Sequence, residues 1–254
     1  MFKNLKIGIR LAFGFALVLI LLIGISGLSL QRIGALDKEV DVMANEHFPK
    51  TVQANDIIDA VNVSVRQLRN AFLYSGQERA SSLAAITEQG KVISAALEKL
   101  EKSLSSDKDR ELFKLLSASR ADYRASQEKG IQIINSDKKP DIQKAEFVQL
   151  LQGELRKTQT EYMKRVNDLI DYQTERVSQS GKAATSMAAE ARQLILGMAI
   201  SAVIIAVLFA WWVTRSITRP LGEAVDAASR IAEGDLSVRL DASGKDEVGQ
   251  LMGA

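Results

Sequence analysis

The sequence predicts an all-α membrane protein in which two transmembrane helices bracket an extracytoplasmic, up-down four-helix bundle. Two stretches of twenty residues, 11–30 and 194–213, carry no charge. As helices, each would span roughly the 30 Å of a bilayer core. Between them, apolar residues recur at spacings of three and four, as in amphipathic helices. The chain has only 3 prolines and 6% aromatic residues, which favours long helices over a sheet.

The first apolar stretch is expected to remain as a membrane anchor. It is longer than the roughly 7–15 apolar residues of a signal peptide, and no small-residue cleavage site follows it. Short basic flanks prefer the cytoplasm, so both chain ends are predicted to lie inside and the segment between the spans outside. The flanking basic residues are Lys3, Lys6, Arg10, Arg215 and Arg219.

The outer segment is predicted to form four helices, near 31–74, 78–103, 107–135 and 141–193. Polar clusters separate the apolar stripes at three places. Ser75 with Glu78 forms a candidate capping box, and Ser106 is a candidate N-cap. Pro140 is barred from a helix interior and therefore marks the third break. Short connections make neighbouring helices antiparallel.

A candidate ligand site follows from polar residues within the apolar stripe of the third helix. A guanidinium on a buried stripe is costly unless it is paired. Either a carboxylate of a neighbouring helix or an anionic ligand would pair it, whereas a solvated surface arginine is the alternative without a site. At about 1.5 Å per residue, arginines of the first helix lie at an overlapping depth. The candidate ligand-binding residues are Arg66, Arg69, Arg120, Tyr123, Arg124, Gln127 and Thr158.

The composition argues against several other functions. The net charge of +2 gives no basic field for nucleic acid. Cysteine is absent, and His47 is the single histidine, which we interpret as a local structural residue. No phosphate-binding loop, zinc motif or nucleophile motif occurs. We therefore expect no catalytic residue, no metal site and no cofactor, and hence no enzyme.

The segment after the second span contains a short helical module. Pro220 fits the first position of a helix, and Gly234 fits a helix end. Leu236, Val238 and Leu240 alternate as in an extended connector, and a second helix is expected to start at 246–247. This segment resembles a HAMP domain, the signal converter of bacterial membrane receptors. The matching residues are Pro220, Glu223, Gly234, Asp235, Leu236 and the run Asp246-Glu247-x-Gly249.

Together with the N-terminal sequence MFKNLKIGIRLAFGF and the two-span layout, this module makes the chain similar to methyl-accepting chemotaxis proteins with a four-helix-bundle ligand-binding domain. The resemblance implies a homodimer in the bacterial inner membrane with a periplasmic sensor domain. It also implies a small-molecule ligand, an organic acid or amino acid, whose carboxylate Arg66 and Arg69 would hold. Higher-order receptor arrays and the partners CheA and CheW would follow through a cytoplasmic part beyond Ala254, so we expect a fragment of a longer receptor.

The resulting domain prediction has five parts: a cytoplasmic tail 1–10, a span 11–30, a periplasmic bundle 31–193, a span 194–213 and a truncated HAMP domain 214–254. Signal transmission is expected to depend on Trp211, Trp212, Pro220, Glu223, Gly234 and Glu247. Two alternatives stay open at this point. One is the sensor half of a histidine kinase or diguanylate cyclase, and the other is a membrane scaffold that binds only a partner protein.

Overall fold

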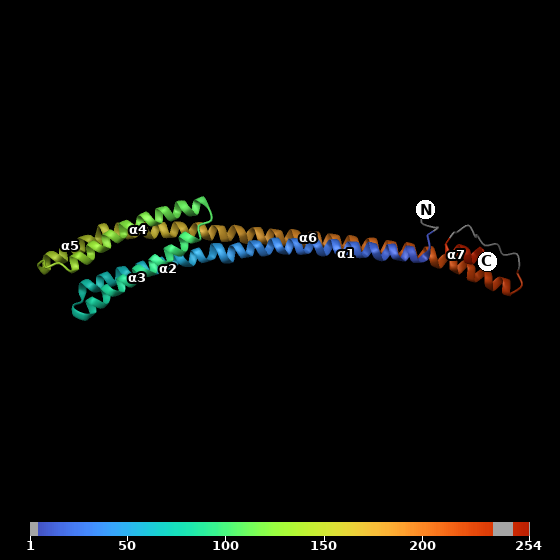
Figure 1. The fold of residues 1–254 in the computed structure, drawn as a ribbon, viewed down its shortest axis with the longest axis horizontal. Coiled ribbons are helices and arrows are strands. Elements are labelled where there is room, and N and C mark those ends of the chain that lie inside the picture. The colour runs from blue at the N-terminus through green and yellow to red at the C-terminus, as the bar shows by residue number, and fades with distance from the viewer. Residues whose placement is uncertain (1–4, 236–245, 254) are drawn as a thin grey trace. The chain divides into compact units, whose positions relative to one another are not determined.

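The computed structural model describes residues 5–235 and 246–253, and the chain divides into two compact units. Unit 1 comprises Met1–Leu36 and Thr185–Ala254, and unit 2 comprises Asp37–Ala184. Every regular element in the described residues is a helix (Figure 1). The predicted all-α class is therefore confirmed.

Unit 1 contains the two apolar segments. The helix α1 (Ile7–Asp41) carries the first, and α6 (Glu154–Ala232) carries the second. Both are long and apolar enough to cross a membrane. Large apolar side chains are exposed along both, for example Phe15 and Ile23 at 71% each. Such a surface is unfavourable in water and is what a helix in lipid presents.

Unit 2 is the helical bundle. It begins with a short π-helix, η2 (Val42–His47), and continues with α2 (Phe48–Leu73), α3 (Gly76–Lys102), α4 (Asp107–Ile134) and α5 (Pro140–Gln152) before α6 starts at Glu154. Figure 1 shows α3 returning alongside α2. All of these α-helices contribute fully buried apolar side chains to one core, including Ile57, Leu68, Leu100, Leu116, Phe147 and Leu169. The rings of Phe72 and Phe147 stack 4.1 Å apart and join α2 to α5.

Local sequence signals predicted some of the helix ends correctly and others incorrectly. Ser106 caps α4 in a reciprocal capping box with Asp109, as expected for an N-cap serine. Gly234 has φ +94° just after the end of α6, which confirms the predicted helix stop. The candidate box at Ser75 is wrong, because its side chain makes no capping hydrogen bond. Gly76 has φ +55° there and opens α3, so the turn itself sets the entry of the chain.

The structure differs from the predicted helix boundaries at three points. The first bundle helix contains the π-helix 42–47, whose last residue, His47, bonds to Gln173 of α6. The fourth breaks at Gly153, where glycine permits a backbone geometry outside the helical range. Pro220 lies inside α6 and not at a helix start. Its missing N–H removes one bond, to the carbonyl of Ser216, and the helix continues across the gap.

Candidate functional site

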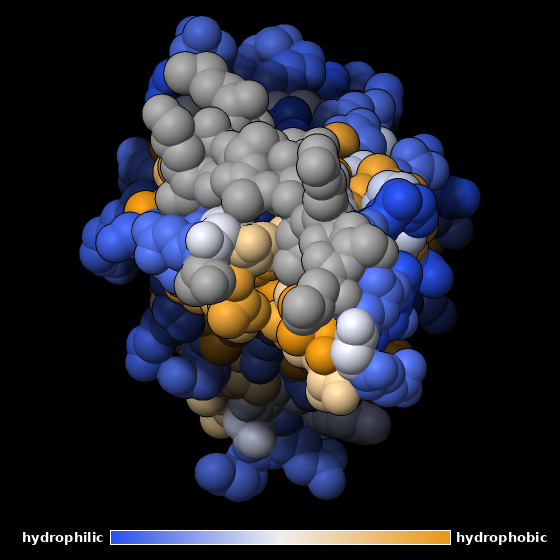
Figure 2. Space-filling view, turned by 90° about the vertical axis from the view of Figure 1, so that its right-hand side faces the viewer, coloured by the Kyte–Doolittle hydropathy of each residue, from blue (hydrophilic) through white to orange (hydrophobic). Residues whose placement is uncertain are grey.

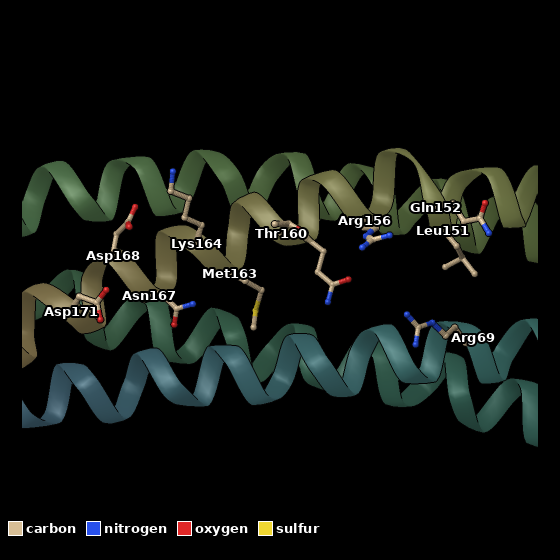
Figure 3. Close-up of a pocket in the computed structure, with 11 residues that line it drawn as sticks. Arg69, Leu151, Gln152, Arg156, Thr160, Met163, Lys164, Asn167, Asp168 and Asp171 are labelled. Atoms are coloured by element: carbon tan, nitrogen blue, oxygen red, sulfur yellow. The ribbon is translucent and has the colours of Figure 1, made fainter.

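An open groove on unit 2 lies between α2 and α6, with a volume of about 820 Å³. Arg69 lines it from α2, and residues from the end of α5 and the first five turns of α6 line the rest. Figure 3 shows Arg69 and Arg156 extending from opposite helices into the same end of the groove. Asp168 and Asp171 lie toward the other end (Figure 3).

The charges of this groove are unevenly compensated. Asp168 accepts a hydrogen bond from Arg165 at 3.3 Å, so one of the two negative charges at that end already has a partner. Among the described residues, no carboxylate lies within ion-pair distance of Arg69 or Arg156. Lys164 adds a third cation to the lining. The end formed by the two arginines therefore attracts an anion, and their planar guanidinium groups suit a carboxylate.

The polar residues predicted as a ligand site on α4 lie outside this groove. Tyr123 is 3% exposed and stacks on Tyr162 of α6, with ring centroids 5.6 Å apart. Its hydroxyl accepts a hydrogen bond from Nε2 of Gln127 at 3.2 Å. Burial raises the pKa of both tyrosines above the ordinary value, so both stay neutral. Arg120 donates to the hydroxyl of Ser94 on α3 at 2.6 Å.

Of the seven candidate ligand residues, the structure places Arg69 alone among the residues that line the groove. Arg66 and Arg124 are exposed elsewhere on α2 and α4. Thr158 bonds to Ser126 with 2.6 Å between the hydroxyl oxygens and so joins α6 to α4. Tyr123 and Thr158 thus join α4 to α6 inside the bundle, whereas Gln127 bonds to Tyr123 within α4.

Sequence reasoning missed the α6 side of the groove. Arg156, Thr160, Met163, Asn167 and Asp171 recur at spacings of three and four, on a face next to the apolar stripe of the same helix. This second stripe, of mixed polarity, was the sequence signal that could have identified the α6 side of the groove. It resembled a solvated surface because it carries charges of both signs.

A second polar site, the Lys50 cluster, lies at the junction of η2, α2, α4 and α6 and is buried at its centre. It comprises Glu46, His47, Lys50, Ser105, Asp109 and Gln173. The Nζ atom of Lys50 lies 3.1 Å from Oδ2 of Asp109, with the side chains 1% and 2% exposed. Nε2 of Gln173 donates to Oδ1 of Asp109 at 2.5 Å. The Oε1 atom of Gln173 therefore accepts, at 3.0 Å, from Nδ1–H of His47, which fixes the histidine tautomer.

The Lys50 cluster holds its carboxylates ionised. Burial alone would raise the pKa of Asp109, but the bond and charge of Lys50 and the backbone N–H groups of Ser105 and Ser106 outweigh it and lower the pKa to about 2. A hydrogen bond from the Ser105 hydroxyl holds the pKa of Glu46 below its ordinary value. His47 is thus part of a structural network, in agreement with its interpretation from the sequence.

The candidate signal-transmission residues all lie in unit 1. Trp211 and Trp212 follow one another on α6, and the guanidinium of Arg215 lies 5.6 Å from the ring centroid of Trp211. Glu223 is exposed and lies 3.4 Å from Nε of Arg219. Glu247 is the first residue of α7 (Glu247–Gly253). The extended connector predicted at Leu236, Val238 and Leu240 falls outside the described residues.

Comparison with known proteins identifies the class of molecule that carries these sites. Residues 4–188 match the family described as a four helix bundle sensory module for signal transduction. The chain belongs to this family. Residues 212–254 match the HAMP domain. The protein is thus a membrane-anchored, chemoreceptor-type sensory module, and sensory bundles and HAMP domains of this kind are non-enzymatic signalling modules.

Individual relatives agree with this assignment. The sensory transducer protein YvaQ of Bacillus subtilis is 30% identical over 164 residues, which cover 63% of this chain and 27% of YvaQ. The methyl-accepting chemotaxis protein McpQ of Pseudomonas putida is 41% identical over 64 residues, covering 25% of this chain and 10% of McpQ. A sensory transducer protein of Acetivibrio thermocellus is 22% identical over 179 residues, covering 70% of this chain and 31% of its own. The chain therefore spans less than a third of the length of these relatives.

Proposed function

We propose that this sensory module detects a small anionic ligand in the periplasm, through the groove between α2 and α6. One observation carries the proposal: Arg69 and Arg156 reach into the same end of the groove from two helices without a carboxylate partner in the described chain. An organic acid or amino acid would supply the missing carboxylate, and Gln159, one turn after Arg156 on α6, offers an amide group in the same lining.

The groove also connects a ligand to the helix that continues to the HAMP domain. α6 is one helix of 79 residues, and its first turns line the groove. A ligand that binds α2 and α6 together favours the arrangement in which the arginines lie close. The ligand increases the population of this arrangement because it binds it more tightly than the arrangement in which the arginines lie apart. The size of the shift is set by the ratio of the two affinities. A displacement of α6 by about 1–2 Å is the expected scale of such a change.

The test is a ligand screen on the whole chain in detergent or nanodiscs, read by thermal shift and then by calorimetry. A carboxylate present at 100 times its dissociation constant should stabilise the binding-competent bundle by about 2.7 kcal/mol. Arg69→Ala and Arg156→Ala should each weaken binding roughly 10- to 100-fold, because each removes a charged hydrogen bond of about 1.5–3 kcal/mol.

Matched variants distinguish this groove from the α4 site predicted from the sequence. Arg66→Ala removes an arginine from the same helix outside the groove lining, and Arg120→Ala removes the one bonded to Ser94. Both should leave the affinity within twofold. Loss of affinity in Arg120→Ala with native affinity in Arg156→Ala would move the site to α4 and refute the groove.

We further propose that the chain works as a homodimer in the bacterial inner membrane, with the bundle in the periplasm and the HAMP domain in the cytoplasm. Leu221, Val225 and Ile231 are exposed along the last turns of α6, and Leu251 is exposed on α7. Figure 2, a view onto this end of the chain, shows hydrophobic residues at the surface. A second HAMP domain would cover them, as in a parallel helical bundle. Crosslinking between cysteines introduced at residue 225 tests this, and a monomer in native-like lipid would contradict it.

The output is proposed by analogy with the relatives named methyl-accepting chemotaxis proteins. In that function the module controls the kinase CheA together with the partner protein CheW. The receptors assemble into arrays, and the module itself has no catalytic activity. Fusion of residues 1–254 to the signalling region of McpQ, expressed in a strain without other receptors, tests this. Ligand-dependent swimming bias would support it, whereas a fusion that is inserted but never alters swimming would refute it.

A further inference from the structure

The N-terminal end of α1 makes contacts that its role as a membrane anchor does not require. Arg10 is 3% exposed, although a basic residue that only marks the cytoplasmic flank would lie among lipid headgroups or water. Its Nη2 forms an ion pair with Asp246, the residue just before α7, and both side chains are buried. Its Nη1 donates to Oγ of Ser216 on α6 at 3.2 Å. One guanidinium therefore joins three helices of unit 1.

Two further bonds secure the same junction. The backbone N–H of Ile7, in the first turn of α1, donates to Oε2 of Glu247 at 2.8 Å. This bond holds the pKa of Glu247 below its ordinary value. Oδ1 of Asp246 accepts from the backbone N–H of Gly249 at 2.9 Å, so Asp246 caps α7 with one oxygen and binds Arg10 with the other. The start of α1 thus donates two bonds to the start of α7, to Asp246 and to Glu247.

Ser216 lies at a weak point of α6. Pro220 has no backbone N–H, so the carbonyl of Ser216 lacks its usual helical partner four residues later. A helix bends more readily at such a gap. The bond between Arg10 and Ser216, at 3.2 Å, is lost when its atoms move apart by less than 1 Å. A displacement of α6 of the size expected for signalling therefore acts directly on the side chain that holds α7.

We propose that Arg10 is a positioning residue of the HAMP domain: it fastens the second HAMP helix, α7, to the first membrane span and to Ser216 of α6. α1 is then part of the path to the output and not only an anchor. Loss of the Arg10–Asp246 pair is strongly unfavourable because both side chains are buried, so the pair favours the position of α7 next to α1.

The test uses the whole chain in nanodiscs, and the absence of cysteine makes introduced thiols unique. Spin labels at Gly8→Cys and Gln250→Cys, both exposed positions, report the α1–α7 distance. The labelled parent should give one narrow distance distribution. Arg10→Ala and Asp246→Ala should each move at least half of the population to longer distances. In the same variants, α7 amides should exchange with deuterium at least tenfold faster.

The decisive variant is the charge exchange Arg10→Asp with Asp246→Arg, which should restore at least half of the narrow population. Lys6→Ala is the control, because it removes an exposed positive charge from the same flank and tests a general effect on insertion. Far-UV circular dichroism establishes that each variant keeps its helices. Native distances in both alanine variants would overturn the proposal. The proposal would also be overturned if the charge-exchange variant showed the same longer distances as the single variants.

Discussion

Removal of either partner of the buried pair Lys50–Asp109 should destabilise the bundle, but by unequal amounts. Asp109→Ala leaves the Lys50 ammonium 1% exposed with Glu46 at 3.5 Å and the Ser105 hydroxyl as its remaining partners. Breaking a buried pair in this way costs about 3–5 kcal/mol. Lys50→Met leaves Asp109 bonded to Gln173 and to two backbone N–H groups. We therefore expect a smaller loss, of about 1–2 kcal/mol.

The pH dependence of stability gives a second, independent measure of the same pair. The pKa of Asp109 is about 2 in the folded bundle against 3.8 for an ordinary aspartate carboxyl. Because the folded pKa is the lower one, the stabilisation is complete above pH 4 and is lost as the pH falls from about 4 to 2. The difference of 3.8 − 2 corresponds to about 2 kcal/mol at 1.36 kcal/mol per pKa unit. Lys50→Met should reduce this dependence, because it removes one of the groups that lower the pKa.

Urea unfolding of the whole chain in detergent, followed by far-UV circular dichroism between pH 7 and pH 2.5, measures both effects. Lys102→Met is the matched control, since Lys102 pairs with Glu98 on the surface of α3, with side chains 74% and 66% exposed. It should unfold like the parent. Equal losses in Lys50→Met and Asp109→Ala would refute the argument, as would an acid dependence that survives Lys50→Met unchanged.

Three further predictions test individual contacts by substitution. Gly14→Ala would place a Cβ atom 2.3 Å from the ring of Phe209, so we expect a loss of about 1–3 kcal/mol in SDS-titration unfolding of the α1–α6 pair. Tyr162→Phe removes a buried hydroxyl that has no hydrogen-bond partner among the described residues, so the urea midpoint should stay the same or rise. Ser106→Ala should cost about 1 kcal/mol by breaking a capping box, whereas Ser75→Ala, at a helix start without a side-chain cap bond, should leave the midpoint unchanged.

Each of these three has its own contradicting outcome. Gly27→Ala should leave the same titration unchanged, because within the described chain the added Cβ meets no atom within 4 Å beyond its own helix backbone. Equal losses at the two glycines would remove the close approach as the cause. A Tyr162→Phe variant less stable by more than 1 kcal/mol would show that the hydroxyl has a partner. Identical midpoints for the two serine variants would contradict the capping geometry.

The sequence alone determined the architecture, because the forces that set it act within one helix. Two uncharged stretches of twenty residues have no stable place outside lipid, and the apolar spacing between them allows only helices that bury one face. Ser106, Pro140 and Gly234 marked element ends through their own hydrogen bonds and backbone angles. These effects need no knowledge of the neighbouring helices.

Only the tertiary structure decided which polar residues meet. Arg69 and Arg156 are 87 residues apart in the chain (156 − 69), and nothing local brings them to one groove. Tyr123 is a core residue because Tyr162 packs on it, and Arg10 is buried because Asp246 pairs with it. The rotation of each helix about its own axis is set by side chains packed across several elements at once. A stripe on one helix predicts that a face is buried, but the partner of each residue on it depends on the other helices.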